Sequence, residues 1–194
     1  MRVMVLHAHP VEESFNHALY NAVIETLKAN GHQVDPVDLY AEGFNPVMSR
    51  DGRLNYHHVP DNVTPELKPY VDRLMAAEGL VIVHPVWNYG FPAILKGFFD
   101  RVFLPGVSFD LVNGKVRPTL HNIGKVAAVT SYGGSRFRAI LMGDPPRKII
   151  NRMVRATVRP GSPVSYLAHY SMNLSTEQTR SAFQHKVKVA MDAF

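Results

Sequence analysis

Apolar runs of strand length alternate along the chain with longer segments in which apolar residues recur at helical spacing. Several runs are apolar at almost every position, as in Leu80-Val81-Ile82-Val83. Such runs are typical of parallel strands buried on both faces of a sheet. Five strands are predicted in this way, over residues 2–7, 33–38, 80–84, 125–131 and 164–169.

The segments between the strands predict amphipathic helices with recognisable ends. Ser14 suits the N-cap of the first helix, Gly31 its end, and Pro92 the first turn of the third helix. The predicted helices cover about residues 14–30, 65–77, 92–102, 146–158 and 176–193. Strands that alternate with helices predict an α/β protein of three layers, in one domain over residues 1–194.

Two connections, residues 39–64 and 104–124, are long for a compact domain. Loops of this size are usually functional, or they contain elements that the pattern does not reveal.

Composition narrows the class of protein. The apolar fraction of 46% is that of a globular chain, and the absence of cysteine excludes disulfides, thiol nucleophiles and cysteine metal sites. The apolar run after Met1 is too short for a signal peptide, and no apolar stretch approaches ~20 residues, so we expect a cytoplasmic protein.

The net charge of +5 is compatible with a nucleic-acid partner or with a basic enzyme that handles anionic ligands. The second interpretation is favoured, and no nucleic-acid partner is expected, because the basic residues are spread along the chain. They are densest between residues 136 and 159. That stretch is either a solvated helix face or a surface that attracts the phosphates of NADPH or an acidic partner; its basic residues are Arg136, Arg138, Arg147, Lys148, Arg152, Arg155 and Arg159.

Three loops leave the carboxyl ends of predicted strands, where ligands bind in open parallel sheets. The first loop holds His9 and leads into Ser14, Phe15 and Asn16 at a helix N-terminus, which is a natural anion site. It has neither of the glycine-rich motifs that bind ATP or dinucleotides. From the residues alone, a simple helix cap at Ser14 is the more frequent alternative.

The second loop is rich in aromatic residues and proline, so it is stiff and flat-sided and suits a planar ring, although a hydrophobic plug is the alternative. Its candidate residues are Pro85, Val86, Trp87, Asn88 and Tyr89. The third loop has paired glycines, which allow close approach of a ligand or a positive-φ turn. Its candidate residues are Ser131, Tyr132, Gly133 and Gly134.

No metal site is predicted. The sequence contains no His-Glu-x-x-His, and the pairs His7/His9 and His57/His58 lack a carboxylate at a recognisable ligand spacing.

Three segments share their pattern with one known family. Ala8-His9 followed by Ser14-Phe15-Asn16 has the spacing of its phosphate loop, Asp38–Ala41 resembles the segment after its second strand, and Pro92–Phe103 resembles its third helix almost residue for residue. On these residues the chain resembles the NAD(P)H:quinone oxidoreductase family. This is the flavodoxin-like group that includes mammalian quinone reductase and the bacterial ancillary proteins of potassium-efflux channels.

The resemblance implies a flavodoxin-like fold with strand order 2-1-3-4-5 and FMN or FAD as cofactor. The first loop would hold the flavin phosphates, and the second and third loops would contact the isoalloxazine ring. It further implies two-electron ping-pong transfer from NAD(P)H to a quinone-like acceptor, in a homodimer. The family's catalytic tyrosine and histidine have no clear counterpart beyond Gly134, so no catalytic side chain is assigned. The alternatives are a regulatory flavoprotein subunit of a potassium-efflux-type membrane transporter and a flavodoxin-like electron carrier.

Overall fold

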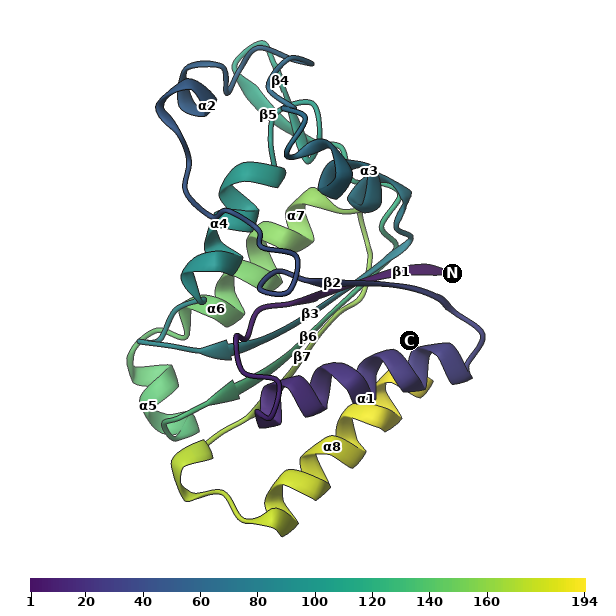
Figure 1. Cartoon of the computed structure of the whole chain (residues 1–194), viewed down its shortest axis with the longest axis vertical. Helices are drawn as coiled ribbons and strands as arrows, with labels where there is room; N and C mark the ends of the chain where they lie inside the picture. The colour runs from purple at the N-terminus through teal and green to yellow at the C-terminus, as the bar shows by residue number, and fades with distance from the viewer.

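A five-stranded parallel sheet forms the middle layer of the computed structural model, which describes residues 1–194 (Figure 1). The strand order is β2-β1-β3-β6-β7, which is the expected 2-1-3-4-5 when only these five strands are counted. All five predicted strands are confirmed, and two of them extend further toward their carboxyl ends. The strands are β1 (Arg2–His7), β2 (Gln33–Asp38), β3 (Gly79–Val86), β6 (Lys125–Tyr132) and β7 (Val164–His169).

Helices cover both faces of the sheet (Figure 1). α1 (Phe15–Ala29) and α8 (Glu177–Asp192) pack together on one face, over Val3 and Val5 of β1. Met4 and Leu6 of the same strand point to the opposite face, because successive strand residues alternate sides. The elements on that face are α3 (Lys68–Ala76), α4 (Ala93–Val102), α6 (Pro145–Lys148), the π-helical turn η1 (Ile149–Val154) and α7 (Arg155–Thr157). Burial on both sides explains why the strands are apolar throughout.

The predicted helix ends are confirmed for α1. The Ser14 hydroxyl accepts a hydrogen bond from the backbone N–H of His17, and Gly31 has a φ of +76°, which favours glycine. Pro92 is the N-cap of α4 rather than a first-turn residue. The predicted fourth helix runs through α6, η1 and α7 and begins one residue early, at Pro145. No helix of the structure is both long enough and apolar enough to cross a bilayer.

The two long connections contain short elements that the apolar pattern did not predict. The 39–64 connection includes α2 (Arg50–Leu54). The 104–124 connection folds into a hairpin of β4 (Phe109–Val112) and β5 (Lys115–Pro118). Two further short helices, α5 (Arg136–Leu141) and η2 (Met172–Leu174), follow β6 and β7. All of these elements are short and largely exposed, so they lack the periodic apolar stripe on which the prediction depended.

Candidate functional site

The first loop places an imidazole and a helix N-terminus at the carboxyl end of β1. In the tautomer that carries its proton on Nε2, Nδ1 of His9 accepts from the backbone N–H of Val11 at 3.1 Å, and the Nε2–H can donate to a ligand. Burial lowers the pKa of His9, so its ring is mainly neutral near pH 7. With Ser14 capping the helix, the free N–H groups of the first turn of α1 remain available to an anion.

Asn16 is the residue of this loop that the chain itself does not satisfy. Its side chain is buried, with the residue only 2% exposed, yet neither its amide nitrogen nor its carbonyl oxygen has a hydrogen-bond partner within the chain. Buried polar groups are nearly always paired, because an unpaired one costs about 1–3 kcal/mol. An unpaired amide beside a helix N-terminus fits a site that is completed by a polar ligand.

The second loop turns sharply after β3. Trp87 and Gly90 exchange two backbone hydrogen bonds, of 3.2 and 2.8 Å, around Asn88 and Tyr89. Both central residues have positive φ, 48° and 59°, so this is a two-residue turn of type I′. A tyrosine rarely adopts positive φ, and such strained positions cluster at ligand sites. The turn holds Trp87 40% exposed at the sheet edge.

The third loop follows β6, and neither of its two glycines, Gly133 and Gly134, has a positive φ. The alternative that these glycines form a positive-φ turn is therefore wrong. A Cβ atom at Gly133 would lie 3.5 Å from the amide of Asn173, and one at Gly134 would lie 3.5 Å from the hydroxyl of Tyr89. Both are ordinary contacts. The chain therefore does not itself require glycine here, which leaves close approach of a ligand as the predicted reason.

The three loops lie side by side. The strand registers align His7 with Val83 and Pro85 with Ser131, so the three strands end at one edge of the sheet. The ring centroids of His9 and Trp87 are 5.8 Å apart, and Tyr89 reaches Gly134 as described above. The structure thus brings the three predicted loops together at one edge of the sheet.

A buried polar network stands behind the third loop. The Tyr132 hydroxyl donates to Oδ1 of Asp144 at 2.5 Å and lies 2.7 Å from the Tyr166 hydroxyl. Arg147 donates from Nε to Oδ2 of the same Asp144 at 2.8 Å. Burial, together with the nearby Tyr166 and the Asp144 carboxylate, raises the pKa of Tyr132, so the phenol stays protonated. Tyr132 therefore holds the third loop in position from the protein interior.

Sequence reasoning missed several residues at this edge. Among them are Asn173, which lies beside Gly133, and His169 at the end of β7, whose ring meets Phe15 edge-on at 5.5 Å. Asp144 and Tyr166 were also missed. These residues come from segments without a recognisable motif, and only the predicted sheet order, which places β7 beside β6, could have indicated His169.

The structure also assembles a histidine cluster that the spacing did not predict. Nδ1 of His7 donates to Oδ2 of Asp38 at 2.8 Å, and His17 lies close enough that one ligand atom from each of the three lies within 4.8 Å of the others. The Tyr20 ring stacks on His7 at 4.4 Å. The residues come from β1, α1 and β2, so no local motif connects them. The hydrogen bond and the stacking account for a packed histidine pair behind the first loop.

His84 makes the stability of this edge sensitive to acid. Its imidazole is fully buried, and burial lowers its pKa to about 4 from an ordinary value of 6.5. The unfolded chain then takes up a proton at higher pH than the folded chain, so the stabilisation is complete above pH 6.5 and is lost as the pH falls toward 4.

His84→Asn removes the titrating ring but keeps a donor for the Pro85 carbonyl. Between about pH 7.5 and about pH 5, we expect the free energy of unfolding of the variant to fall by about 2 kcal/mol less than that of the wild type. Urea unfolding at the two pH values measures the difference. If the free energy of unfolding falls by the same amount in the variant and in the wild type, groups other than His84 cause the loss of stability in acid.

Comparison with known proteins agrees with this geometry. Residues 1–159 match the family described as having the flavodoxin-like fold. The chain therefore belongs to the flavodoxin-like family. Among its curated relatives is an uncharacterised NAD(P)H oxidoreductase of Escherichia coli (strain K12), 31% identical over 142 residues, which are 73% of this chain and 69% of that protein.

The NAD(P)H dehydrogenase [quinone] 1 of Rattus norvegicus is 29% identical over 157 residues, covering 73% of this chain and 57% of that protein. The expected resemblance to the quinone oxidoreductase family is thus confirmed. The matched region spans between 57% and 69% of these two proteins.

Solved structures share the fold over the whole chain. The NAD(P)H:quinone oxidoreductase from Methanothermobacter marburgensis superposes with a TM-score of 0.82 at 23% identity, covering 99% of this chain and 96% of that one. An FMN-dependent NADH-azoreductase from Bacillus anthracis, solved with FMN, gives a TM-score of 0.77 at 16% identity, covering 99% and 98%. At these identities the two comparisons establish the fold.

Proposed function

We propose that this protein is a flavin-dependent NAD(P)H oxidoreductase that reduces quinones or similar acceptors by two-electron ping-pong transfer. The observation that carries the proposal is the unpaired, buried amide of Asn16 at the N-terminus of α1. The loop before this helix places the His9 ring 5.8 Å from the ring of Trp87. The names of the relatives support the same class of reaction.

The residues present fit FMN or FAD. His9 and the first turn of α1 supply N–H donors for a flavin phosphate, and Asn16 supplies both a donor and an acceptor. Backbone from Pro85 to Tyr89 would run beside the isoalloxazine ring. Ser131 to Gly134 would meet its other edge, where the glycines leave room.

A bound flavin would supply the redox chemistry, which is two-electron transfer from NAD(P)H to the acceptor. The chain's own part is to bind, orient and shield. The type I′ turn fixes Trp87 at the sheet edge, and the network of Asp144 with Tyr132 holds the third loop in one position. Both are rigid supports, which is what orienting a ring against a second substrate requires.

Steady-state kinetics tests the proposed reaction. The flavin-loaded protein should oxidise NAD(P)H when a benzoquinone is added, with parallel double-reciprocal lines because both substrates use the site in turn. Intersecting lines would contradict the ping-pong order. Flavin that NAD(P)H cannot reduce at a turnover rate would instead point to an electron carrier.

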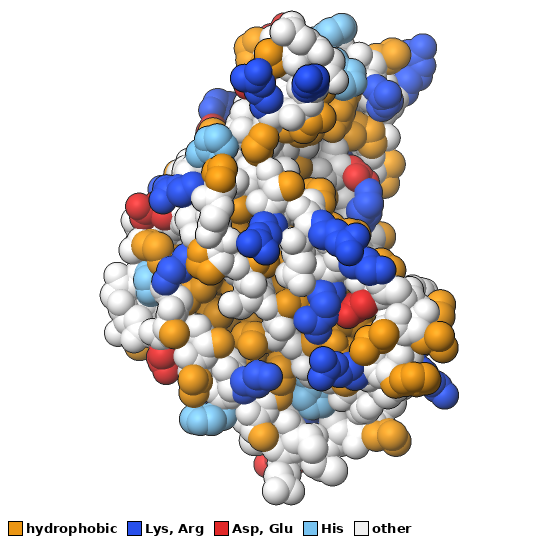
Figure 2. All heavy atoms as spheres, turned by 180° about the vertical axis from the view of Figure 1, so that it is seen from behind, with side chains coloured by type: hydrophobic (Ala, Val, Ile, Leu, Met, Phe, Trp, Pro, Cys, Tyr) orange, Lys and Arg blue, Asp and Glu red, His pale blue; other side chains and the backbone are white.

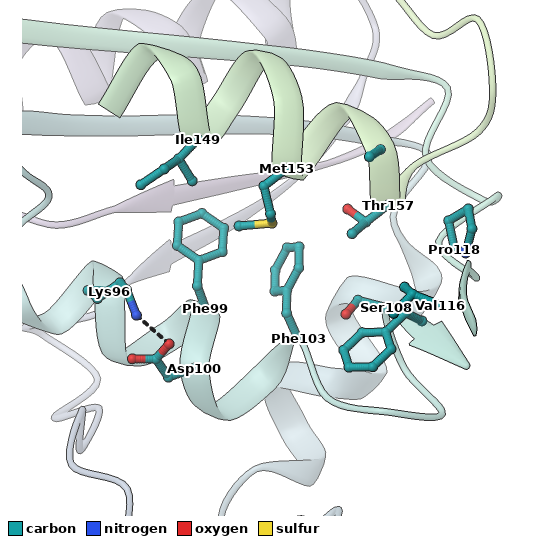
Figure 3. A pocket seen from close by; sticks show the side chains of 12 residues that line it. Lys96, Phe99, Asp100, Phe103, Ser108, Val116, Pro118, Ile149, Met153 and Thr157 are labelled. Atoms are coloured by element: carbon teal, nitrogen blue, oxygen red, sulfur yellow. Dashed lines mark hydrogen bonds and ion pairs between the residues drawn. The ribbon is translucent and has the colours of Figure 1, made fainter. Parts of the chain in front are cut away.

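The face formed by α4, the hairpin and the π-helical turn supports a homodimer. A hollow of about 480 Å³ opens there, and Figure 3 shows Phe99 and Phe103 of α4 facing Met153 across it. Val116 and Pro118 of the hairpin line its other end (Figure 3). Most of the lining is apolar, which is the composition of the buried centre of a dimer interface.

We expect the wild-type protein to elute as a dimer and Met153→Asp to convert it to a monomer of 21.7 kDa, because a charge would be buried without a partner. Light scattering after gel filtration measures the mass. Val189→Asp, on the exposed side of α8, is the matched control and should stay dimeric. A wild-type monomer at working concentration would overturn the dimer.

A further inference from the structure

A second pocket opens beside the third loop. Its volume is about 370 Å³, and its lining includes Arg136, Ile140, Asp144, Arg147, Lys148 and Tyr170. It follows β6, whereas the helix N-terminus that fits the flavin phosphates follows β1, two strands away in the sheet. The two places are therefore separate, and a flavin phosphate at α1 leaves this pocket free.

The pocket carries uncompensated positive charge. Its one carboxylate, Asp144, is already engaged by Tyr132 at 2.5 Å and by Arg147 at 2.8 Å. Arg136 and Lys148 are exposed and form no ion pair and no side-chain hydrogen bond. Two cations thus face the pocket without a partner. On the face of the molecule seen in Figure 2, Lys and Arg are also more prominent than acidic residues. An anionic ligand is the complement of such a pocket.

The third cation of the pocket is held in a fixed position. Arg147 donates from a terminal nitrogen to the Tyr170 hydroxyl at 2.8 Å, and its guanidinium lies 4.3 Å from the centre of the Tyr166 ring. Tyr170 in turn stacks near Tyr132, with 4.7 Å between ring centroids. The fixed guanidinium and the two unpaired cations therefore line the same pocket.

The pocket is also connected to the third loop, beside which the nicotinamide ring of the donor would bind. The backbone N–H of Ser171, next to Tyr170, donates to the carbonyl of Gly134 at 2.8 Å. Gly134 belongs to the loop proposed to meet the flavin ring. This hydrogen bond places the pocket next to the loop at which the nicotinamide end of a dinucleotide would bind.

We propose that this pocket binds the 2′-phosphate of NADPH and makes NADPH the preferred electron donor over NADH. The inference rests on the proposed function, because it names the donor for that same site. NADPH and NADH differ only in this phosphate, and arginine is the usual partner of the group where an enzyme distinguishes them. Ile140, 61% exposed, and Tyr170 offer apolar surface for the adjoining adenosine.

The double variant Arg136→Ala/Lys148→Ala tests the preference. The wild type should show a kcat/KM for NADPH at least about 10-fold above that for NADH. The double variant should lose about 30-fold for NADPH and less than about 2-fold for NADH, because NADH lacks the phosphate that the two cations would contact. Lys186→Ala/Lys188→Ala on α8 removes the same charge elsewhere and should leave the ratio unchanged. A wild type without preference, or equal losses for both donors, would overturn the proposal.

Calorimetry with fragments gives a readout that needs no turnover. Adenosine 2′,5′-bisphosphate should bind the wild type and bind the double variant at least about 10-fold more weakly, while adenosine 5′-monophosphate should bind both weakly. Equal binding of the two nucleotides by the wild type, or competition by inorganic phosphate alone at equal strength, would contradict a 2′-phosphate site. If the protein takes up no flavin but still binds the bisphosphate more tightly than the monophosphate, the proposed function is refuted and the 2′-phosphate site is supported.

Discussion

Replacing Asn16 by leucine is expected to weaken flavin binding by about 10- to 100-fold while leaving the flavin-free protein as stable as before, or more so by about 1 kcal/mol. Flavin affinity is expected to fall while the stability of the flavin-free protein does not, because the amide is buried without a partner in the chain. Leucine has nearly the same size and removes the desolvated polar group. Fluorescence titration with FMN and with FAD, together with urea unfolding of the flavin-free protein, measures the two effects.

Asn62 provides the matched control for this experiment. It is also a buried asparagine, 5% exposed, but its amide donates to the carbonyls of Tyr56 and Pro105 at 3.0 and 2.9 Å. Asn62→Leu should therefore lower the stability by about 2 kcal/mol or more and leave flavin affinity unchanged. If Asn16→Leu instead lowers the stability of the flavin-free protein and spares flavin binding, Asn16 is structural and the assignment of the first loop is wrong.

Replacing Gly97 by alanine is expected to lower the melting temperature by about 5 °C, through a loss of about 2 kcal/mol. An added Cβ atom would lie 2.4 Å from the carbonyl oxygen and 2.5 Å from the Cα of Pro46. Both are backbone atoms, so α4 would have to move away from the segment around Pro46. The gain in helix propensity, about 1 kcal/mol, is smaller than the cost of that movement. Differential scanning calorimetry measures the shift.

Gly52 in α2 is the control for the effect of propensity alone. A Cβ there would meet only side-chain atoms and no backbone atom, namely the hydroxyl oxygen of Ser49 at 3.1 Å and the sulfur of Met48 at 3.4 Å. Gly52→Ala should change the melting temperature by less than about 2 °C. A similar loss in both variants would show that the contact with Pro46 does not determine the position of α4.

The sheet could be predicted from the sequence because its signals are local and strong. A run such as Leu80–Val83 is apolar on both faces only if both faces are covered, and Ser14 with Gly31 marks the ends of α1 through backbone chemistry. The hairpin was missed although Asn113-Gly114 is a strong turn signal, with φ values of 52° and 73° in the structure. Its strands are too short and too exposed to show alternation.

The candidate site was predicted as three loops and not as one arrangement. The residues of each loop are adjacent in sequence, and the sheet order aligns their ends. The partners that hold those loops were not predictable, because Asp144 meets Tyr132 only after β6 and its following helix have folded, and His169 meets Phe15 across the sheet edge. The unpaired state of the Asn16 amide is likewise visible only once its surroundings are known.

The visible absorption spectrum of the purified protein, followed by chromatography of any released cofactor, tests the central claim most directly. The turn at His9, the amide of Asn16 and the loops at Trp87 and Gly134 predict a yellow protein that releases FMN or FAD and is bleached by NAD(P)H. A colourless protein that takes up neither FMN nor FAD on reconstitution would contradict it.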